Sequence, residues 1–395
     1  MDMELTNNII YANNLDTARF ARMFNTTAQS YKFYWLEAIL NLLASHEGDI
    51  VFEEIVDEMI CEAWHTVTHF HLHLGPSING NAENFLEHAI NTLNVVVNIS
   101  NRPSRDELLA AIREADAQIR ADKLSLVNLV PYRLLYPFLN VQGMEEGFEY
   151  LKNNSRTRLI AYLEKMQGSE KLLYTFVDGV GLNKKIRMNP DWRRFMLENY
   201  AVIRSWVQYH KAQYLQDRNP GVPGIIYKLC PEADDVRRLD QARALWRATV
   251  DVTGQPIREI YTGAEIGVEE LSIDHFVPHS YISNDELWNL VPMRRSLNSS
   301  KNNRLPQWDR FFGEFAAYQF YLYDLVFPES DEARVPILIE RFNKCRKNNV
   351  NAIWASENLY IGGNSREQFT NMLEHNLKPI YEAARQQGYD IWQPM

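Results

Sequence analysis

The sequence predicts a mainly α-helical protein that contains one small embedded α+β module. Apolar side chains recur at helical spacing through the first half of the 395-residue chain, and again in an aromatic-rich segment over 308–327. Between these regions, residues 271–306 contain two short apolar runs with strand character, followed by a segment rich in Asn and Ser. This stretch concentrates more polar chemistry than any other part of the chain, so we expect the functional site there.

Helix signals follow one another along the chain. Asp16 is placed to cap a helix, and Ser104 followed by Glu107 has the pattern of a capping box. Helices are expected over 16–24, 30–43, 55–64, 105–126, 155–166, 191–214, 234–250 and 308–327. The last is aromatic on most sides, and such a helix is usually buried, so we expect the C-terminal part to pack on the rest.

Residues 218–224 form the clearest boundary, because two prolines and two glycines in seven residues disfavour a continuous helix. We therefore predict a helical N-terminal domain over 1–220 with a regulatory, partner-binding or substrate-binding role. Residues 221–310 would form the domain that carries the polar stretch. Residues 311–395 would form a C-terminal helical segment that packs on the rest.

Net charge limits the possible functions. The chain has 41 basic and 51 acidic residues, which gives a formal net charge of −10. Phosphate contacts supply most non-specific affinity for nucleic acid, so this balance argues against a protein that coats nucleic acid. Any activity on nucleic acid therefore needs a local basic surface or a partner that delivers the substrate.

The cysteines and the apolar runs exclude further classes of protein. The three cysteines lie far apart without a CxxC pair, which argues against a disulfide framework and excludes a four-cysteine zinc site.

No apolar run approaches the ~20 residues of a membrane span, so we expect no membrane association. The first residues are acidic and polar where a signal peptide would be basic and then apolar. We expect a cytoplasmic protein.

The polar stretch offers the groups that hydrolysis of a phosphodiester needs. Asp274 and His275 are neighbours on a predicted strand over 272–278, so their side chains face opposite sides. They can take separate roles in one site only if the strand end is twisted or the substrate lies across it. Asn289 lies in a second apolar run, where an Asn commonly bonds backbone groups of a loop. Asn298 and Lys301 share one face if 296–304 is helical. Each element alone also has a structural explanation, such as a helix cap; their order and spacing together favour catalysis.

This order of residues resembles the HNH endonuclease family and its ββα-metal fold. The interval from His275 to Asn298 is similar to that in family members such as the HNH domain of the CRISPR effector nuclease. The resemblance implies that His275 is the general base and that Asp274 and Asn298 are ligands of one Mg²⁺ or Mn²⁺ ion. It implies two further catalytic roles: Asn289 holds the loop over the hairpin, and Lys301 faces the scissile phosphate.

The resemblance extends upstream and also has a consequence for zinc. Residues 260–263 resemble the first hairpin turn of the family, which often carries a zinc-binding CxxC pair. That pair is absent here, so no structural zinc is expected. On this reading 221–310 is an HNH nuclease domain.

A local basic strip near the predicted site supplies the basic surface that an acidic chain needs for activity on nucleic acid. Arg294, Arg295 and Arg304 lie close to the predicted site, and guanidinium groups suit phosphate oxygens, so we predict that they contact nucleic acid. His279 could be a further contact to the substrate or a further metal ligand, and a loop-bonding role is equally open.

Two other clusters have competing explanations. Four histidines between 65 and 73 could bind a metal, but 65 and 69 have helical spacing while 69, 71 and 73 alternate as on a strand, which favours a polar or substrate-facing surface. A basic cluster at 184–194 could touch phosphate or form a solvated surface.

The sequence therefore predicts metal-dependent hydrolysis of DNA, with one strand nicked per event unless the protein dimerises. A large helical region beside a small nuclease suggests controlled cutting, as in bacterial anti-phage defence or restriction, with a regulatory protein partner or a homodimer as the control. The alternatives are a catalytically silent nucleic-acid-binding or assembly protein that retains the module as a scaffold, and an RNA nuclease.

Overall fold

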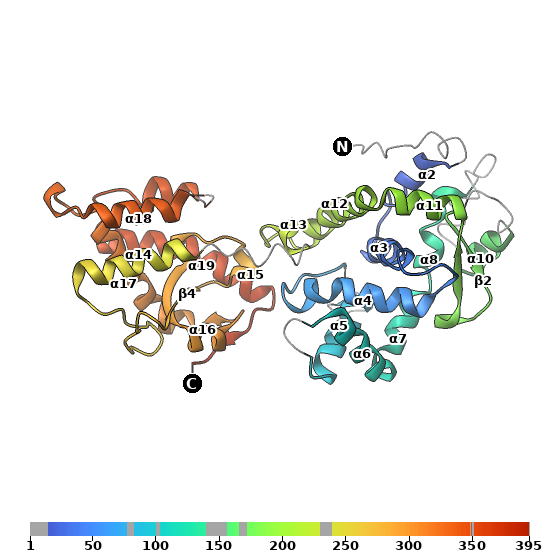
Figure 1. Cartoon of the computed structure of the whole chain (residues 1–395), viewed down its shortest axis with the longest axis horizontal. Coiled ribbons are helices and arrows are strands. Elements are labelled where there is room, and N and C mark those ends of the chain that lie inside the picture. Colours follow the sequence, from blue (N-terminus) through green and yellow to red (C-terminus); the bar gives the residue numbers. More distant parts are fainter. Residues whose placement is uncertain are drawn as a thin grey trace. The chain divides into compact units, whose positions relative to one another are not determined.

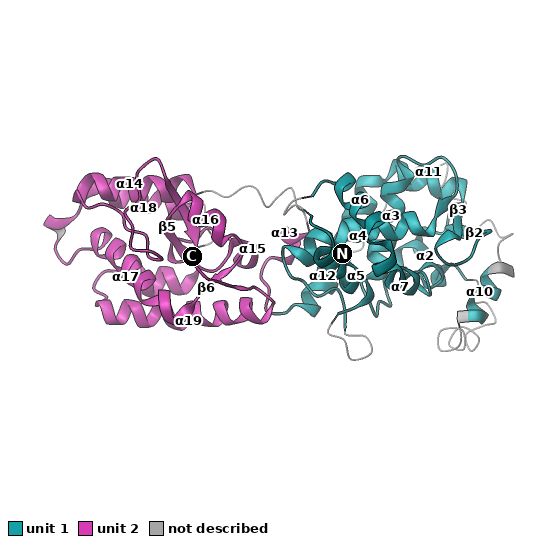
Figure 2. Cartoon of the chain, turned by 90° about the horizontal axis from the view of Figure 1, so that it is seen from below, with its two compact units in different colours: residues 1–220 teal, residues 221–395 magenta. Residues whose placement is uncertain are grey.

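The computed structural model describes residues 15–76, 83–99, 103–139, 156–165, 172–229, 239–347, 349 and 351–394. The chain divides into two compact units, residues 1–220 and 221–395 (Figure 2). The division falls inside the segment rich in Pro and Gly. Helices dominate both units and the strands are short, so the mainly helical fold class with a small α+β module is confirmed.

Unit 1, residues 1–220, is built around helix α3 (Tyr31–Leu43), nearly all of whose residues are buried (Figure 1). Helix α3 packs against α4 (Phe52–Thr68), α11 (Pro190–Glu198) and α12 (Tyr200–Arg218). Helix α4 also packs against α5 (Phe85–Val96), α6 (Arg105–Glu114) and α7 (Asp116–Leu126). A helix with so few polar positions is stable only where neighbours cover it.

Shorter elements complete unit 1. They are α2 (Thr17–Ala21), α8 (Val130–Arg133), α10 (Arg156–Lys165) and 3₁₀ turns at Tyr136–Phe138 and Gly181–Asn183. The predicted caps are present: Asp16 accepts the Arg19 N–H at 3.0 Å, and Ser104 forms its capping box with Glu107.

Two helices expected to be continuous are each broken once. The helix predicted over 105–126 is α6 and α7, with Ala115 between them. The helix predicted over 191–214 is α11 and α12, which part at Asn199, where the side-chain Nδ2 donates to the Phe195 carbonyl at 2.9 Å. The Asn199 backbone N–H donates to the same carbonyl at 3.0 Å. Helix α5 was not predicted, and the starts of the helices expected at 155 and 234 lie outside the described residues.

A small antiparallel sheet in unit 1 was also missed. It has the order β1-β3-β2, from β1 (Ile50–Val51), β2 (Tyr174–Val177) and β3 (Lys185–Met188). Buried and exposed residues alternate along β3, which is the strand signal. The sheet accounts for part of the basic cluster at 184–194, because exposed Arg187 of β3 forms a two-bond pair with Asp49 at 2.7 and 2.8 Å.

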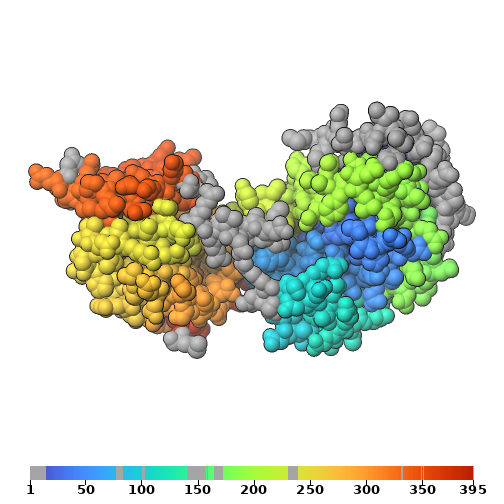
Figure 3. All heavy atoms as spheres, in the orientation of Figure 1, coloured from blue at the N-terminus to red at the C-terminus, as the bar shows by residue number. Residues whose placement is uncertain are grey.

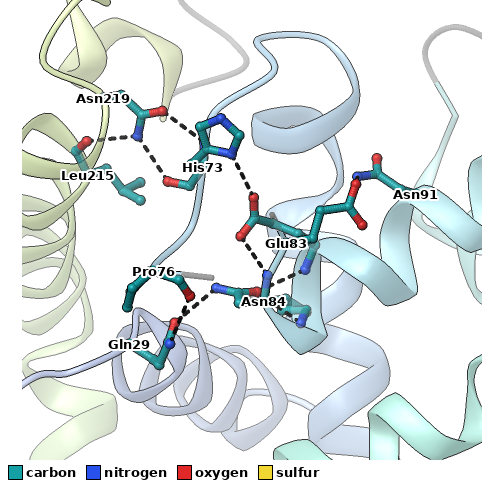
Figure 4. A network of polar contacts seen from close by, with 10 residues as sticks. Gln29, His73, Pro76, Glu83, Asn84, Asn91, Leu215 and Asn219 are labelled. Atoms are coloured by element: carbon teal, nitrogen blue, oxygen red, sulfur yellow. Dashed lines mark hydrogen bonds and ion pairs between the residues drawn. The ribbon is translucent and has the colours of Figure 1, made fainter. Parts of the chain in front are cut away.

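One of the clustered histidines of unit 1, His73, takes part in a hydrogen-bond network. Asn219, just after α12, accepts the His73 N–H at 2.8 Å and donates to the His73 and Leu215 carbonyls at 2.9 and 2.8 Å (Figure 4). The His73 ring pairs with Glu87 of α5 at 3.2 Å, and this bond raises the pKa of His73. The network connects the end of α12 to α5, which is a structural role.

Unit 2, residues 221–395, contains the predicted module. Strands β4 (Leu271–His275) and β5 (Leu290–Arg294) form an antiparallel hairpin with His275 opposite Leu290. Helix α16 (Arg295–Lys301) follows β5 directly and packs on both strands. The strand expected over 272–278 ends earlier, at His275, and the short helix α15 (His279–Ile282) follows it.

Unit 2 also contains four longer helices. They are α14 (Asp240–Thr253), α17 (Trp308–Val326), α18 (Pro336–Lys347) and α19 (Arg366–Gln386). Figure 3 shows α18, in orange-red, resting on α14, in yellow. The remaining elements are α13 (Ile225–Lys228), 3₁₀ turns at Leu287–Asn289 and Asp331–Ala333, a π-helical turn at Ala355–Leu359, and the parallel pair β6 (Leu305–Pro306) and β7 (Ile391–Trp392).

Helix α17 supports the hairpin directly. The Gln319 side chain donates to the Leu287 and Leu290 carbonyls at 3.0 and 2.6 Å, and Phe315 stacks on Phe276 with ring centroids 4.3 Å apart. The aromatic helix expected over 308–327 is therefore present and buried against the module. Throughout the described ranges, no helix is both long enough and apolar enough to cross a membrane.

Three helices of unit 1 share a buried charged cluster. Glu37 of α3 pairs with Lys211 of α12 at 2.5 Å, and both side chains are buried. Asn41 donates to Glu58 and Glu62 of α4 at 3.2 and 2.8 Å. Burial, together with the charge of Glu37, raises the pKa of Glu62 to about 7.

Replacing Glu62 by Gln is expected to remove a pH dependence of stability. The pKa of Glu62 is about 7 in the folded chain, whereas a Glu in the unfolded chain has the usual pKa of 4.5, so the folded chain binds the proton more tightly. The free energy of unfolding of the wild type should therefore fall as pH rises from about 4.5 to about 7, and the Gln variant should lack this fall. Denaturant unfolding at several pH values measures it, with exposed Glu114→Gln as the control. Equal pH dependence in Glu62→Gln and wild type would contradict the expectation.

Candidate active site

The end of β4 carries the two predicted catalytic neighbours. Asp274 and His275 are both buried, each with 4% of its surface exposed. Because neighbouring residues on a strand point to opposite faces, the two side chains contact different partners. The contacts of Asp274 make up one half of the candidate site, and those of His275 make up the other half.

Asp274 accepts hydrogen bonds on both of its oxygens. The Tyr261 hydroxyl donates to Oδ2 at 3.1 Å, and the Lys301 ammonium lies 3.2 Å from each oxygen. Burial and the charge of Asp274 raise the pKa of Tyr261 well above its usual range, so this phenol stays protonated and donates. An ionised carboxylate offers about four lone-pair positions, so Asp274 can still accept a further partner.

Lys301 lies inside the module. Its side chain has no exposed surface, and Nζ also donates to the His275 carbonyl at 2.8 Å. The sequence predicts that Lys301 faces the scissile phosphate, whereas the structure places the ammonium group against Asp274. A buried ammonium group is costly without a countercharge, and Asp274 supplies it. Direct contact between Lys301 and phosphate stays a prediction.

His275 pairs with Asp285 through Nε2 and Oδ1, which are 2.8 Å apart. A carboxylate oxygen accepts, so Nε2 carries the hydrogen and the lone pair of the neutral ring is on Nδ1. Burial lowers the pKa of His275, and the bond to Asp285 opposes this effect. A neutral ring near pH 7 is the form that can accept a proton from water.

Asp285 is a candidate functional residue that the sequence did not reveal. It lies in the loop between α15 and β5, where no periodic pattern marks it, and only its proximity to His275 in the fold reveals it. The C-terminal part of unit 2 holds this loop: Asn349 donates to the Asp285 carbonyl at 2.8 Å, and the Asn351 N–H donates to Glu286 at 2.6 Å.

Asn289 bonds across the loop as the sequence predicts. Its Oδ1 accepts the Val277 N–H and its Nδ2 donates to the Val277 carbonyl, both at 2.8 Å. The side chain is fully buried. The pair fixes the chain just after His275, so Asn289 acts on the site by holding its backbone.

Asn298 is oriented by bonds from its amide nitrogen. Nδ2 donates to the Ser272 hydroxyl at 3.0 Å and to the Ile273 carbonyl at 3.1 Å. Both hydrogen bonds described for this side chain use the nitrogen, and neither uses Oδ1. Asn298 lines a cavity of about 230 Å³ whose wall also includes Asp274, His275 and His279.

The three predicted arginines differ in their surroundings. Arg295 is exposed and lines the cavity. Arg294 is bound to buried Glu259, with Nη2 at 3.0 Å from Oε2. Arg304 donates to the Lys301 carbonyl at 3.3 Å and to that of Ser300. The geometry supports phosphate contact most directly for Arg295, and contacts by the other two stay predictions.

The residues present fit the ion that the resemblance implies. Asp274 and Asn298 offer a carboxylate and an amide oxygen, which are donors that Mg²⁺ and Mn²⁺ prefer, and the cavity has room for the waters that such an ion retains. A second group consists of His275, His279 and Asp285, whose ligand atoms lie within 4.8 Å of one another. In the part of the chain that the structure describes, the four-histidine segment forms no such group.

Comparison with known proteins agrees with this geometry. Residues 259–307 match the family model described as HNH endonuclease. The matched range contains β4, β5 and α16 and all the residues that bond Asp274. No curated protein and no solved structure matches the chain. Residues 259–307 therefore belong to the HNH endonuclease family, as the order of Asp274, His275, Asn289 and Asn298 predicts.

Proposed function

We propose that the protein is a metal-dependent endonuclease that hydrolyses DNA phosphodiester bonds and cuts one strand per event. The observation that carries the proposal is the His275–Asp285 pair, buried beside a cavity that Asp274 and Asn298 also line. A base and a set of oxygen donors on one cavity are what hydrolysis of a phosphodiester requires. The pair lies inside the segment that matches the family model.

In this proposal His275 takes a proton from the attacking water at Nδ1. Asp285 holds the Nε2–H side of the ring and stabilises the positive charge that the ring gains. Asn289 keeps the backbone after His275 in place, so the ring has one position relative to the cavity. The proton is released to solvent after the bond is cut.

Other residues that line the cavity would bind the phosphate. Asp274 and Asn298 would hold a Mg²⁺ or Mn²⁺ ion, which supplies stabilisation of the negative charge and of the leaving oxygen when it is bound. Tyr261 and Lys301 orient the Asp274 carboxylate. Arg295 places a guanidinium group at the cavity, where it can bind phosphate oxygens.

The wider role is proposed from the sequence. A single site of this kind cuts one strand, so the protein nicks duplex DNA unless it dimerises. Because the chain is acidic, it needs either a local basic surface that binds the DNA or a partner that delivers it. Controlled cutting in anti-phage defence or restriction, with residues 1–220 binding a signal or a partner, is consistent with these features.

Replacing His275 by Ala is expected to lower nicking of supercoiled plasmid by about 10²–10⁴-fold, the usual effect of removing a general base. The assay uses the full chain with Mg²⁺ or Mn²⁺, and a chelator should abolish the wild-type activity. His375→Ala, an exposed histidine of α19, is the matched control.

Three outcomes would change the proposal. A His275→Ala protein that nicks at the wild-type rate would contradict it. DNA binding without nicking in either protein would favour the scaffold, and cleavage of RNA in preference to DNA, offered side by side, would assign an RNA nuclease.

Replacing Asp285 by Asn is expected to lower kcat by at least about tenfold with little change in KM, because Asp285 acts through His275 rather than on the substrate. An amide can donate to Nε2, which moves the ring proton to Nδ1 and removes the base. Asp285→Glu should recover part of kcat. Asp324→Asn, an exposed residue of α17, is the control. Unchanged kcat in Asp285→Asn would remove Asp285 from the mechanism.

A further inference from the structure

We infer that His275, His279 and Asp285 form a second cation site, for ions of the Zn²⁺ class, and that an ion bound there withdraws His275 from its role as base. The binding of the ion is independent of nuclease activity. The effect on catalysis rests on the proposed function above.

The three donors already lie together in the fold. Their ligand atoms are within 4.8 Å of one another, with His275 Nε2 at 2.8 Å and His279 Nε2 at 3.9 Å from the same oxygen of Asp285. His275 and Asp285 are buried and His279 is nearly so, with 14% of its side chain exposed. An ion between them would need only small movements of side chains.

The backbone around the donors is held independently of any ion. Buried Lys228 donates through Nζ to the Tyr281 carbonyl at 3.0 Å and to the Ser283 hydroxyl at 2.6 Å, and so fixes the end of the short helix that begins at His279. Asn349 holds the backbone at Asp285 from the other side. A site whose ligands are positioned in advance loses less conformational entropy on binding.

The donor types select the ion. Two imidazoles and one carboxylate suit Zn²⁺, Co²⁺ and Ni²⁺, whereas Mg²⁺ prefers oxygen ligands. Asp274 and Asn298 offer that oxygen set on the same cavity. Both His275 and His279 line the cavity, which gives an ion from solvent a route to the site and leaves room for water in its remaining positions. The two donor sets therefore separate two classes of ion.

Occupation of the second site changes the ring of His275. An ion takes the lone pair of Nε2, so the single proton of the neutral ring moves from Nε2 to Nδ1. Nδ1 then has no lone pair to accept a proton from water. The ring stays neutral and no redox step occurs. Zn²⁺ is thus expected to inhibit the reaction that Mg²⁺ supports.

Co²⁺ binding to the full-length, chelator-treated protein tests the site. Imidazole-bound Co²⁺ absorbs visible light, and Zn²⁺ should displace it. His279→Gln and Asp285→Asn should each weaken Co²⁺ binding by at least about tenfold, whereas His375→Gln should bind as the wild type does. Circular dichroism checks the folding of each variant, and if Asp285→Asn does not fold, His279→Gln alone decides.

Several outcomes are decisive. Unchanged Co²⁺ binding in folded His279→Gln would overturn the site. Loss of the Co²⁺ absorption in Asn298→Ala would assign the ion to the oxygen donors and would also overturn it. In the nicking assay with Mg²⁺, His279→Gln should need at least about tenfold more Zn²⁺ than the wild type for the same fractional inhibition.

The two proposals can fail separately. Nicking with Mg²⁺ and no Co²⁺ bound by the three side chains would leave the proposed function and overturn the second site. Co²⁺ bound by the three side chains without nicking of any substrate would support the site and overturn the proposed function, together with the withdrawal of the base.

Discussion

The ammonium group of Lys301 and the carboxylate of Asp274 meet inside the HNH module, and the rest of the candidate site depends on this pair. A buried lysine is costly unless an opposite charge and further hydrogen bonds compensate it. Asp274 lies 3.2 Å from Nζ, and the His275 carbonyl accepts at 2.8 Å. Because Lys301 ends α16 and Asp274 lies near the end of β4, the pair fixes the helix against the strand. Asn298, one turn earlier on α16, is thereby brought to the cavity that Asp274 lines.

The ring of His275, the proposed base, is positioned by other parts of the chain, most of them far from it in sequence. Asp285 bonds the His275 ring, and Asn349 and Asn351 hold the loop that carries Asp285. Helix α17 supports the same loop through Gln319. The segment after the module therefore helps to hold the candidate site, although the family match ends at residue 307. This arrangement makes the geometry of a short motif dependent on the whole of unit 2.

The sequence predicts the features that local rules control. The hairpin follows from two short apolar runs, and the helix after it from a segment rich in Asn and Ser. The loop bonds of Asn289 follow from an Asn placed among apolar neighbours. The inward direction of Lys301 and the role of Asp285 could not be predicted in this way, because both depend on contacts across the fold. The break between α11 and α12 at Asn199 is also invisible to apolar periodicity.

The most direct test of the buried pair is a double-mutant cycle on the free energy of unfolding. It compares Asp274→Asn, Lys301→Met and the double variant of the full chain by denaturant titration. Each single change leaves one buried group without its partner, so the double variant should lose less stability than the sum of the two, by about 1–3 kcal/mol. Additive losses would show that the two charges do not stabilise each other and would contradict this account of the site.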